Sequence, residues 1–436
     1  MRKLLVVLVL LAIVFAVLNY HPEPAPVSTG FGTQPELPEP ETGLIPTVHV
    51  AEATGWPEGQ TPLTANGLEV IEFAQGLDHP RWIHVLPNGD VLVAESNSPN
   101  ALSGIKGIKG FVAKRIMKKA GAAVPSADRI TLLRDADNDG VAETQSVFLE
   151  KLYSPFGMTL IGNTLYIANA DGIVSVPYQS GDLKASSQPQ EFFTLPSGIN
   201  HHWTKNIVAS KDGSKLYATV GSNSNIGENG MDIEVGRAAI WEIDVATAKG
   251  TVIASGLRNP VGMDFGPSGE LFTVVNERDE LGDNLVPDYL TSVKQDGFYG
   301  WPYSYFGQIV DERVQPQKPE LVAKAIVPDY ALGAHTASLG LAITNGTQAG
   351  IQSVFGSGAF IGQHGSWNRK PRSGYKVIFV PFVNGMPNGE PRDVLSGFLD
   401  GDTARGRPVG VNFDDKGGLL VADDVGNNIW LVRTKN

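Results

Sequence analysis

The sequence lacks cysteine and is poor in charged residues, which make up only 18% of the chain. Without cysteine there can be no disulfide and no lipid-modified cysteine, so stability must come from the core and from the closure of repeats. Acidic residues outnumber Lys and Arg by 46 to 34, which gives a net charge of −12. Broad nucleic-acid binding is disfavoured, because neutralising phosphates requires clustered Lys and Arg.

Two common catalytic signatures are also missing. The chain has no glycine loop that would cradle a phosphate ahead of a helix, and no Gly-x-Ser-x-Gly turn with triad partners in a suitable setting. Nicotinamide-dependent and acyl-transfer chemistry are therefore disfavoured.

A long apolar run is present at the N-terminus, from Leu4 to Leu18, directly after Arg2 and Lys3. It is shorter than the about 20 residues that span a bilayer, and a Pro-rich stretch follows it. This order is typical of a secretory signal or an uncleaved anchor. We expect residues 1–20 to be a signal peptide or membrane anchor and residues 21–64 a linker. The protein would then be periplasmic or otherwise extracytoplasmic, with any membrane contact made through the N-terminal segment.

The rest of the chain repeats one phrase. With 50 Gly and 29 Pro, the composition favours many tight turns. The phrase opens near a Pro or a small residue, runs through an apolar strand, turns at Asn/Asp-Gly or a similar pair, and continues into a second strand. Its six copies cover residues 79–95, 154–169, 202–221, 259–274, 338–362 and 407–423.

Further strand-like runs follow most copies, so each repeat supplies about four strands. Radial packing of such repeats predicts an all-β, six-bladed β-propeller over residues 65–436. The run from Leu68 to Phe73 precedes the first copy. We expect it to join the C-terminal strands and close the ring, which removes exposed sheet edges.

Residues 97–128 interrupt the first repeat with a basic helical pattern in which Lys and Arg punctuate apolar residues. A basic amphipathic helix can lie on an anionic membrane or a partner. Alternatively, it is a solvated helix that packs over a blade edge.

Polar residues beside the repeated phrases would meet at the mouth of a central channel. Three groups belong to different repeats: Arg258 with Asn259, Arg369, and Arg405 with Arg407. Converging guanidinium groups suit a ligand with several carboxylates, although each Arg could instead form a salt bridge between blades.

Histidine and acidic residues supply further candidates. The pair His201-His202 could provide a general base, a metal ligand or a loop anchor. Two acidic loops, 135–143 and 276–284, offer oxygen ligands for a hard cation such as calcium. In the first loop the final Glu comes earlier than in an EF-hand, and an Asp-rich turn capped by Gly is the alternative.

Together these phrases resemble the quinoprotein glucose/sorbosone dehydrogenase family, and above all its sorbosone dehydrogenase branch, over residues 65 to 434. The segments that carry the resemblance are Gly256-Leu257-Arg258-Asn259-Pro260, Gly297-Phe298-Tyr299-Gly300-Trp301-Pro302, residues 201–223, Arg405-Gly406-Arg407 and residues 422–427.

The resemblance implies a six-bladed propeller that holds pyrroloquinoline quinone (PQQ) and calcium over the channel mouth. His202 would be the base that removes the substrate hydroxyl proton as hydride passes to the quinone. The substrate would be an aldose, a sorbosone-like aldehyde or a related sugar, and the electron acceptor a quinone or cytochrome. The implied cofactor contacts are Arg258, Asn259, Asn223, Arg369, Arg405, Arg407 and Asp423. The implied calcium ligands are Asn276, Glu277, Arg278 and Asp283.

The chain departs from the soluble glucose dehydrogenases, which resemble it less, at two places. They carry a Gln-Gly-Pro turn where this chain has Asn276-Glu277-Arg278, and a cofactor-facing Lys where it has residues 364–369. Two other functions stay open: a calcium-dependent lactonase or esterase on the same fold, and a non-catalytic propeller that binds an envelope component.

Overall fold

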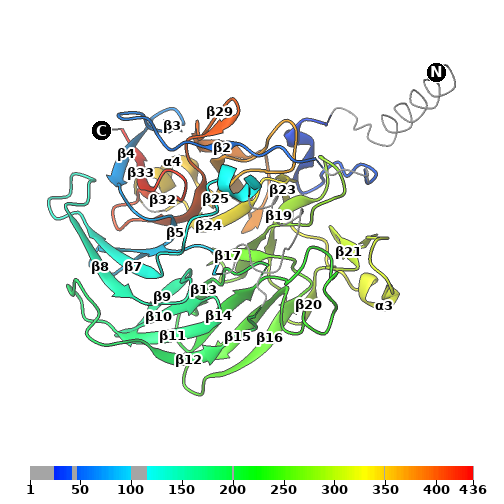
Figure 1. The fold of residues 1–436 in the computed structure, drawn as a ribbon, viewed down its shortest axis with the longest axis horizontal. Helices are drawn as coiled ribbons and strands as arrows, with labels where there is room; N and C mark the ends of the chain where they lie inside the picture. The colour runs from blue at the N-terminus through cyan, green and yellow to red at the C-terminus, as the bar shows by residue number, and fades with distance from the viewer. Residues whose placement is uncertain (1–23, 42–46, 100–114, 199–200, 348, 436) are drawn as a thin grey trace, which may run out of the picture.

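The computed structural model describes residues 24–41, 47–99, 115–198, 201–347 and 349–435. This part of the chain is nearly all β, with few helices between its antiparallel strands (Figure 1). Each of the six repeated phrases forms a hairpin, as predicted. The expected export segment and residues 100–114 of the basic insertion lie outside the described residues.

Among the described residues, six sheets contain four or more strands, and we number them in chain order. Sheet 1 contains β5 (Pro80–Val85), β6 (Val91–Glu95), β7 (Arg129–Arg134) and β8 (Thr144–Glu150). Sheet 2 contains β9 (Met158–Ile161), β10 (Thr164–Asn169), β11 (Gly172–Pro177) and β12 (Gln190–Thr194). Sheet 3 contains β13 (Ile207–Ala209), β14 (Lys215–Val220), β15 (Ala239–Asp244), β16 (Lys249–Ser255) and β20 (Gly297–Phe298).

The other three sheets are built in the same way and carry additional short strands. Sheet 4 contains β17 (Pro260–Phe265), β18 (Leu271–Val275), β19 (Pro287–Ser292), β23 (Tyr330–Ala334) and β1 (Phe31–Gly32). Sheet 5 contains β24 (Ser338–Asn345), β25 (Ser357–Gln363), β26 (Lys376–Val383), β28 (Arg392–Ser396), β3 (Leu63–Thr64) and, beside β26, β27 (Met386–Pro387). Sheet 6 contains β31 (Pro408–Phe413), β32 (Leu419–Asp423), β33 (Asn428–Thr434) and β4 (Leu68–Ala74).

Smaller elements connect or flank these sheets. They are β2 (Glu52–Ala53) with β30 (Thr403–Ala404) and β29 (Leu399–Asp400), β21 (Ser304–Tyr305) with β22 (Ile309–Val310), the 3-10 turn η1 (Val27–Gly30), α3 (Pro319–Val322) and α4 (Ile351–Phe355).

The first strands of the six sheets contact one another in a closed cycle. The order is β5, β9, β13, β17, β24 and β31, and β31 contacts β5 again. Apolar clusters fill the spaces between successive sheets, for example Trp82 with Phe156 between sheets 1 and 2, and Phe379 with Trp430 between sheets 5 and 6. Sheets packed face to face around a centre are propeller-type packing.

The glycine of the repeated phrase explains how the first strands approach so closely. A Cβ added at Gly340 would lie 2.1 Å from the carbonyl oxygen of Val409 on the next first strand, and one at Gly410 would lie 2.8 Å from that of Arg81. Any larger side chain would separate these neighbouring backbones. The glycine is therefore required by packing, not by a turn.

The ring closes through both ends of the chain. β4 pairs antiparallel with β33, with Ile71 opposite Leu431, which confirms the pairing expected for residues 68–73. Described parts of the segment expected to be a linker also pair with the sheets: β1 with β23, β2 with β30 and β3 with β28.

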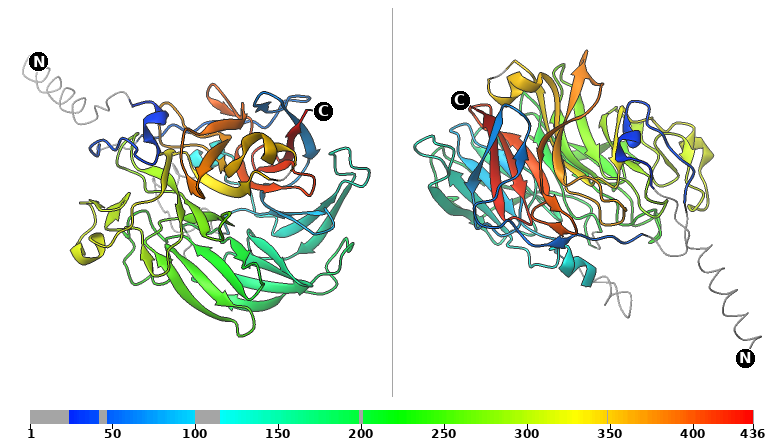
Figure 2. Two further views of the ribbon diagram at one scale, coloured as in Figure 1. Left: turned by 180° about the vertical axis from the view of Figure 1, so that it is seen from behind. Right: turned by 90° about the horizontal axis from the view of Figure 1, so that it is seen from above.

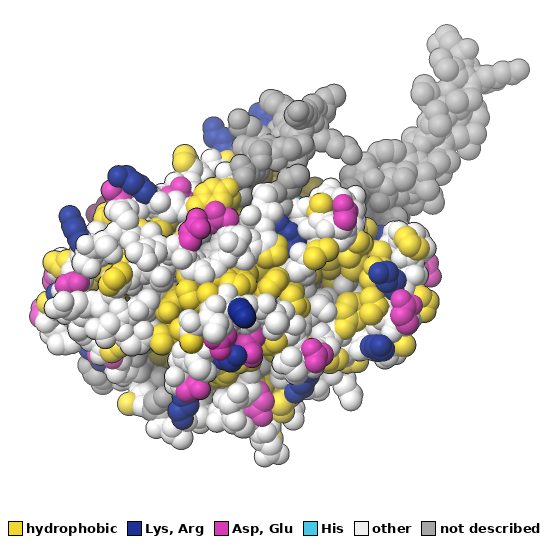
Figure 3. Space-filling model, turned by 90° about the horizontal axis from the view of Figure 1, so that it is seen from below, with side chains coloured by type: hydrophobic (Ala, Val, Ile, Leu, Met, Phe, Trp, Pro, Cys, Tyr) yellow, Lys and Arg dark blue, Asp and Glu magenta, His cyan; other side chains and the backbone are white. Residues whose placement is uncertain are grey.

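The two ends of the cycle differ. The mouth is defined as the end of the ring at which the first strand of each sheet starts. The loops that join the second strand to the third strand of each sheet lie at this same end. The helical turn at 115–119 projects from this face, whereas α4 lies at the opposite one (Figure 2, right). Figure 3 shows one side of the ring, where apolar side chains form a band among charged side chains of both signs. No helix within the described residues is long and apolar enough to cross a membrane.

Candidate functional site

His202 lies at the mouth, in the loop that leads into β13. Its Nδ1 atom lies 2.9 Å from the carbonyl oxygen of Ser222 and 3.0 Å from the Ser222 hydroxyl. A carbonyl oxygen only accepts, so Nδ1 carries the ring proton and Nε2 carries the lone pair. Burial, together with the positive charge of Arg258, lowers the pKa of His202 well below its usual value. The ring is therefore neutral at neutral pH and can take up a proton at Nε2.

The support for His202 is close-packed. Ser222 donates its backbone N–H to the carbonyl of Arg258 at 2.8 Å and its hydroxyl to Ser224 at 2.7 Å. A Cβ at Gly221 would lie 2.5 Å from the Cβ of His202 and 2.4 Å from Oδ1 of Asn259. Glycine at this position thus lets the histidine approach Asn259, whose buried Oδ1 has no hydrogen-bond partner among the described residues.

Arg258 is buried, and its guanidinium group lies among oxygen atoms. It donates to the carbonyl of Glu277 at 2.6 Å, to Oδ1 of Asn225 at 2.8 Å and to Oδ2 of Asp279 at 3.2 Å. Longer bonds reach the carbonyl and Oδ1 of Asn276, at 3.3 and 3.4 Å. Arg258 thus holds the β14–β15 and β18–β19 loops together beside His202.

Asp279 is shared between Arg258, Asn368 of the β25–β26 loop and His335 of the loop from β23 to β24. Asn368 donates to its Oδ1 at 2.7 Å, and Nδ1 of His335 lies 3.5 Å from the same oxygen. Burial alone would raise the pKa of Asp279, but the hydrogen bond to His335 and the charge of Arg258 lower it to about 2. Burial would likewise lower the pKa of His335, yet the hydrogen bond and charge of Asp279 raise it.

A second buried carboxylate, Asp424, organises the other side of the mouth. It pairs with Arg81, with Nε2 of His364 at 2.9 Å and with His79 at 3.5 Å. Burial would raise the pKa of Asp424, but these three neighbours hold it well below its usual value. Burial lowers the pKa of His364 to about 4, more than the carboxylate raises it. The neutral His364 ring therefore donates from Nε2 to Asp424.

The two sides are connected through Arg81 and sheet 5. The guanidinium carbon of Arg81 lies 5.8 Å from the ring centre of Trp203, the neighbour of His202 in the chain. The backbone N–H of His364 donates to the carbonyl of Ala337 at 2.9 Å, two residues after His335. Side chains from sheets far apart in the sequence thus surround one mouth.

Arg407 has unused donors in this arrangement. It is 4% exposed, and its guanidinium carbon lies 4.8 Å from the ring centre of Tyr375. Nη1 donates to the carbonyls of Gly365 and His364, at 3.3 and 3.5 Å. Nε and Nη2 are buried and have no partner among the described residues. Buried charged donors without acceptors are costly, so this guanidinium group has the chemistry to receive an anion.

Two other arginines predicted to contact the cofactor have protein partners. Arg369 is buried and donates to the carbonyls of Asp283, Pro371 and Ala25. Arg405 is partly exposed and forms an ion pair with Asp400. The structure does not bring either guanidinium group into contact with His202 or Arg407.

Asp423 is fully buried and accepts four hydrogen bonds. The donors are Trp56 at 2.7 Å, Trp430 at 3.1 Å and the backbone N–H groups of Arg407 and Gly426, at 2.7 and 2.8 Å. Burial nevertheless raises its pKa to about 6. Asp423 thus orients the backbone of Arg407.

The predicted calcium loop, 276–283, is partly committed to internal contacts. Glu277 and Arg278 form a buried ion pair, and Arg278 also bonds to Asp311 and to the carbonyls of Pro302 and Ser304. Asn276 donates to Asp288 at 3.2 Å. Oε1 of Glu277 and Oδ1 of Asp283 are buried and have no hydrogen-bond partner in the part of the chain that the structure describes, and the same holds for Oδ1 of Asn223 in the neighbouring loop.

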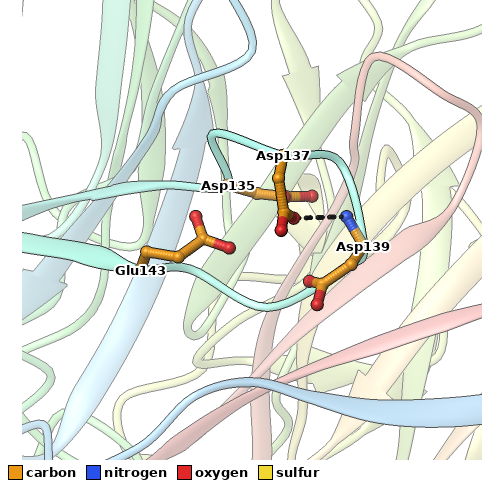
Figure 4. A group of neighbouring side chains, drawn as sticks. All are labelled: Asp135, Asp137, Asp139 and Glu143. Carbon is orange, nitrogen blue, oxygen red and sulfur yellow. Dashed lines mark hydrogen bonds between the residues drawn. The ribbon is translucent and has the colours of Figure 1, made fainter.

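The other acidic loop lies at the opposite end of the ring, between β7 and β8. It holds the one cluster of possible metal ligands found within the described residues. Carboxylate oxygens of Asp135, Asp137, Asp139 and Glu143 all lie within 4.8 Å of one another (Figure 4). This end is away from His202.

His79 and Arg81 are mouth residues that the sequence does not single out. Their signal is positional: His79 precedes the Pro that begins a first strand, as Asn259 and Arg407 do. Nothing in the sequence, however, indicates that Arg81 pairs with Asp424.

Comparison with known proteins decides the family. The TrAA12-like family model matches residues 62–296 and 311–435, which is most of the chain. The chain belongs to the TrAA12-like family. The match covers strands from all six sheets and both sides of the mouth.

The chain is also similar to individual proteins of known sequence or structure. An uncharacterized protein of Borreliella burgdorferi is 30% identical over 294 residues, which cover 64% of this chain and 76% of that protein. The PQQ-dependent pyranose dehydrogenase of Coprinopsis cinerea is 23% identical over 437 residues, which cover 85% of this chain. They cover 54% of that enzyme, so this TrAA12-like chain spans about half of its length. The holo structure of its PQQ domain superimposes with a TM-score of 0.68 at 21% identity, covering 88% of this chain and all of the domain.

Proposed function

We propose that this TrAA12-like protein is a PQQ-dependent oxidoreductase that oxidises a sugar or sugar aldehyde, with His202 as the general base. The observation that carries the proposal is the state of His202, which is neutral, has its proton on Nδ1 and presents the Nε2 lone pair at the mouth. The names of its relatives, a PQQ-dependent pyranose dehydrogenase and that enzyme's PQQ domain, support the cofactor.

The donor set at the mouth fits a quinone that bears carboxylates. Nε and Nη2 of Arg407 are buried donors without acceptors, and a carboxylate would supply acceptors for both. Asn259 lies beside His202 against Gly221 and would contact the same ligand. When bound, the quinone would accept the hydride and so supply the redox chemistry that no side chain of this protein can supply.

The residues of the chain would then handle the proton. A substrate hydroxyl placed within hydrogen-bond reach of His202 Nε2 would donate its proton there as its carbon is oxidised. Ser222 would stabilise the resulting imidazolium through the Nδ1 hydrogen bond. Burial, together with the positive charge of Arg258, would keep the ring from being protonated beforehand, since both lower the pKa of His202.

The proposed mouth cation fits less completely. Glu277 Oε1 and Asp283 Oδ1 are free to bind an ion, but Arg258 already donates to the carbonyl of Glu277 and to both oxygens of Asn276. We therefore derive no step through calcium at this loop.

The proposal extends to the fold, the cellular location, the substrate and the electron acceptor. We propose that the six sheets are the six blades of a propeller. We further propose an extracytoplasmic location, an aldose or sorbosone-like substrate, and a quinone or cytochrome as electron acceptor. The cyclic order of the first strands supports the propeller, and the apolar N-terminal run supports the location. The resemblance to the sorbosone dehydrogenase branch supports the substrate and the electron acceptor.

Reconstitution tests the proposal. Purified protein is incubated with PQQ and calcium, and the reduction of an artificial electron acceptor is followed with a panel of aldoses and sugar aldehydes. Turnover that depends on PQQ is expected. Hydrolysis of lactones with calcium alone, without PQQ-dependent oxidation, would instead show that the protein is a calcium-dependent lactonase or esterase.

A further inference from the structure

We propose that the β7–β8 loop, residues 135–143, binds a hard divalent cation of the calcium type and that this ion fastens sheet 1 to sheet 6. The site lies at the end of the ring opposite His202. Its role would be to hold the ring closed, separately from the chemistry at the mouth.

Four carboxylates supply the ligands. Ligand oxygens of Asp135, Asp137, Asp139 and Glu143 all lie within 4.8 Å of one another, and Figure 4 shows the side chains turned toward a common space inside the loop. Calcium takes six to eight oxygen ligands and accepts carboxylates that bind through one or both oxygens. Four carboxylates with a loop carbonyl and water would fill such a shell.

Asp135 provides an independent indication of a missing partner. Its side chain is only 8% exposed, and its buried Oδ1 has no hydrogen-bond partner among the described residues. Oδ2 accepts from the backbone N–H of Gly140 at 3.1 Å and from Nζ of Lys416 at 3.0 Å. A buried carboxylate oxygen without a donor is unfavourable, and an ion held by the neighbouring carboxylates would satisfy it.

The loop touches the sheet in which the two ends of the chain meet. Nη1 of Arg433 on β33 donates to the carbonyl of Asp139 at 2.9 Å. The backbone N–H of Ala142 donates to the carbonyl of Phe73 on β4 at 2.8 Å. Lys416, in the turn between β31 and β32, reaches Asp135. An ion that orders this loop would therefore stabilise the contacts that sheet 1 makes with β4 and β33 of sheet 6.

The loop also carries a concentration of negative charge that an ion would neutralise. Asp137, Asp139 and Glu143 are exposed, and like charges at this spacing repel one another. Lys416 provides one positive charge, and it is bound to Asp135 alone among the four. We therefore expect the closing contacts to be weaker without the ion than with it.

The test uses the full chain without quinone, stripped of metal with EDTA, and calcium chloride as the probe. Isothermal titration calorimetry measures the number of calcium sites and their affinity, and thermal unfolding is recorded with and without calcium. The variant is Glu143→Gln, and the matched control is Glu150→Gln, at the other end of β8, where the side chain is 64% exposed. Both substitutions remove one negative charge at or beside an end of β8, but only Glu143→Gln removes it from the β7–β8 loop.

We expect calcium to raise the melting temperature of the wild type and the control by a few degrees. Glu143→Gln should bind at this site on the order of 10-fold more weakly or worse, because fewer charged ligands lower the affinity. It should also lose most of the calcium-dependent rise. If Glu143→Gln is poorly folded, Asp137→Asn replaces it, with the same expectation. Equal stoichiometry, affinity and melting shifts in the variant and the control would overturn the proposal, whatever the mouth binds.

Discussion

The Nδ1 atom of His202 lies 2.9 Å from the carbonyl oxygen of Ser222. The contact sets the tautomer of the ring, because a carbonyl cannot donate. It leaves Nε2 as the proton acceptor at the mouth. The tautomer of the proposed base is thus set by a main-chain atom that substitutions cannot remove directly.

Replacing His202 with Asn should lower kcat/KM of the reconstituted protein by about 10²–10⁴-fold, the usual contribution of a general base. Quinone binding should change much less, since His202 is proposed to act on the substrate. Steady-state kinetics and a binding titration on the same sample separate the two. The exposed neighbour gives the control variant His201→Asn, and an equal loss in both variants would contradict the assignment.

The pH profile follows from the pKa of the same ring. Burial lowers the pKa of His202 well below 6.5, so the base stays unprotonated in mildly acidic solution. We expect kcat/KM of the wild type to remain level from pH 7.5 down past 6.5 and to fall only at lower pH. A fall centred at the ordinary histidine pKa would show that the ring is solvated when substrate binds.

Arg407→Met tests the unused guanidinium donors. Because Nε and Nη2 have no hydrogen-bond partners within the described segments, removing them should cost the quinone-free protein little stability. Quinone affinity should fall by about 10–100-fold, as expected for the loss of a charge-assisted bond. The control is Arg405→Met, which removes a guanidinium group bound to Asp400. Thermal shift with and without PQQ measures both effects, and equal affinities of the two variants would place the quinone elsewhere.

The His335–Asp279 pair should make stability depend on pH. The pKa of His335 is raised, so its contribution is full below about 6.5 and is lost as pH rises through the raised value. The pKa of Asp279 is lowered to about 2, so its contribution is present above about 3.9 and is lost as pH falls toward 2.

We therefore expect His335→Gln to be destabilised at pH 5 by about 1–3 kcal/mol and by clearly less at pH 9. Urea unfolding at both pH values measures the difference. The control is His49→Gln, whose ring is 3.7 Å from the exposed Asp402. A loss in His335→Gln that is independent of pH would show that the ring contributes packing and no charge.

Gly340→Ala tests the contact between first strands. The added methyl would lie 2.1 Å from a backbone oxygen of β31, so we expect a loss of about 1–3 kcal/mol or more in the free energy of unfolding. At Gly30 the nearest atom would be 3.4 Å away, and Gly30→Ala should be close to neutral. Chemical unfolding of both variants measures the difference, and equal stabilities would remove the packing explanation for the repeated glycine.

The sequence predicts the repeats well because each hairpin is a local event. Apolar alternation around Asn88-Gly89 or Ser268-Gly269 specifies two paired strands without knowledge of the rest of the chain. Even the long-range pairing of β4 with β33 could be expected, because a closed ring leaves one strand position to fill.

The candidate site was harder to predict, because side-chain partners depend on which loops meet. Arg258, Arg369, Arg405 and Arg407 look equivalent in the sequence. Of these four, only Arg407 has buried donors that find no acceptor among the residues the structure describes. Arg369 holds the N-terminal segment through Ala25, a contact between residues 344 positions apart. Spacing along the chain contains no information of that kind.

The most direct measurement is a titration of metal-replete, quinone-free protein with PQQ, followed by absorbance and continued by adding an aldose under anaerobic conditions. We expect saturation at one quinone per chain and then conversion of the bound quinone spectrum to its reduced form, with His202→Asn binding the quinone but reducing it far more slowly. Absence of saturable quinone binding would show that the protein does not use PQQ.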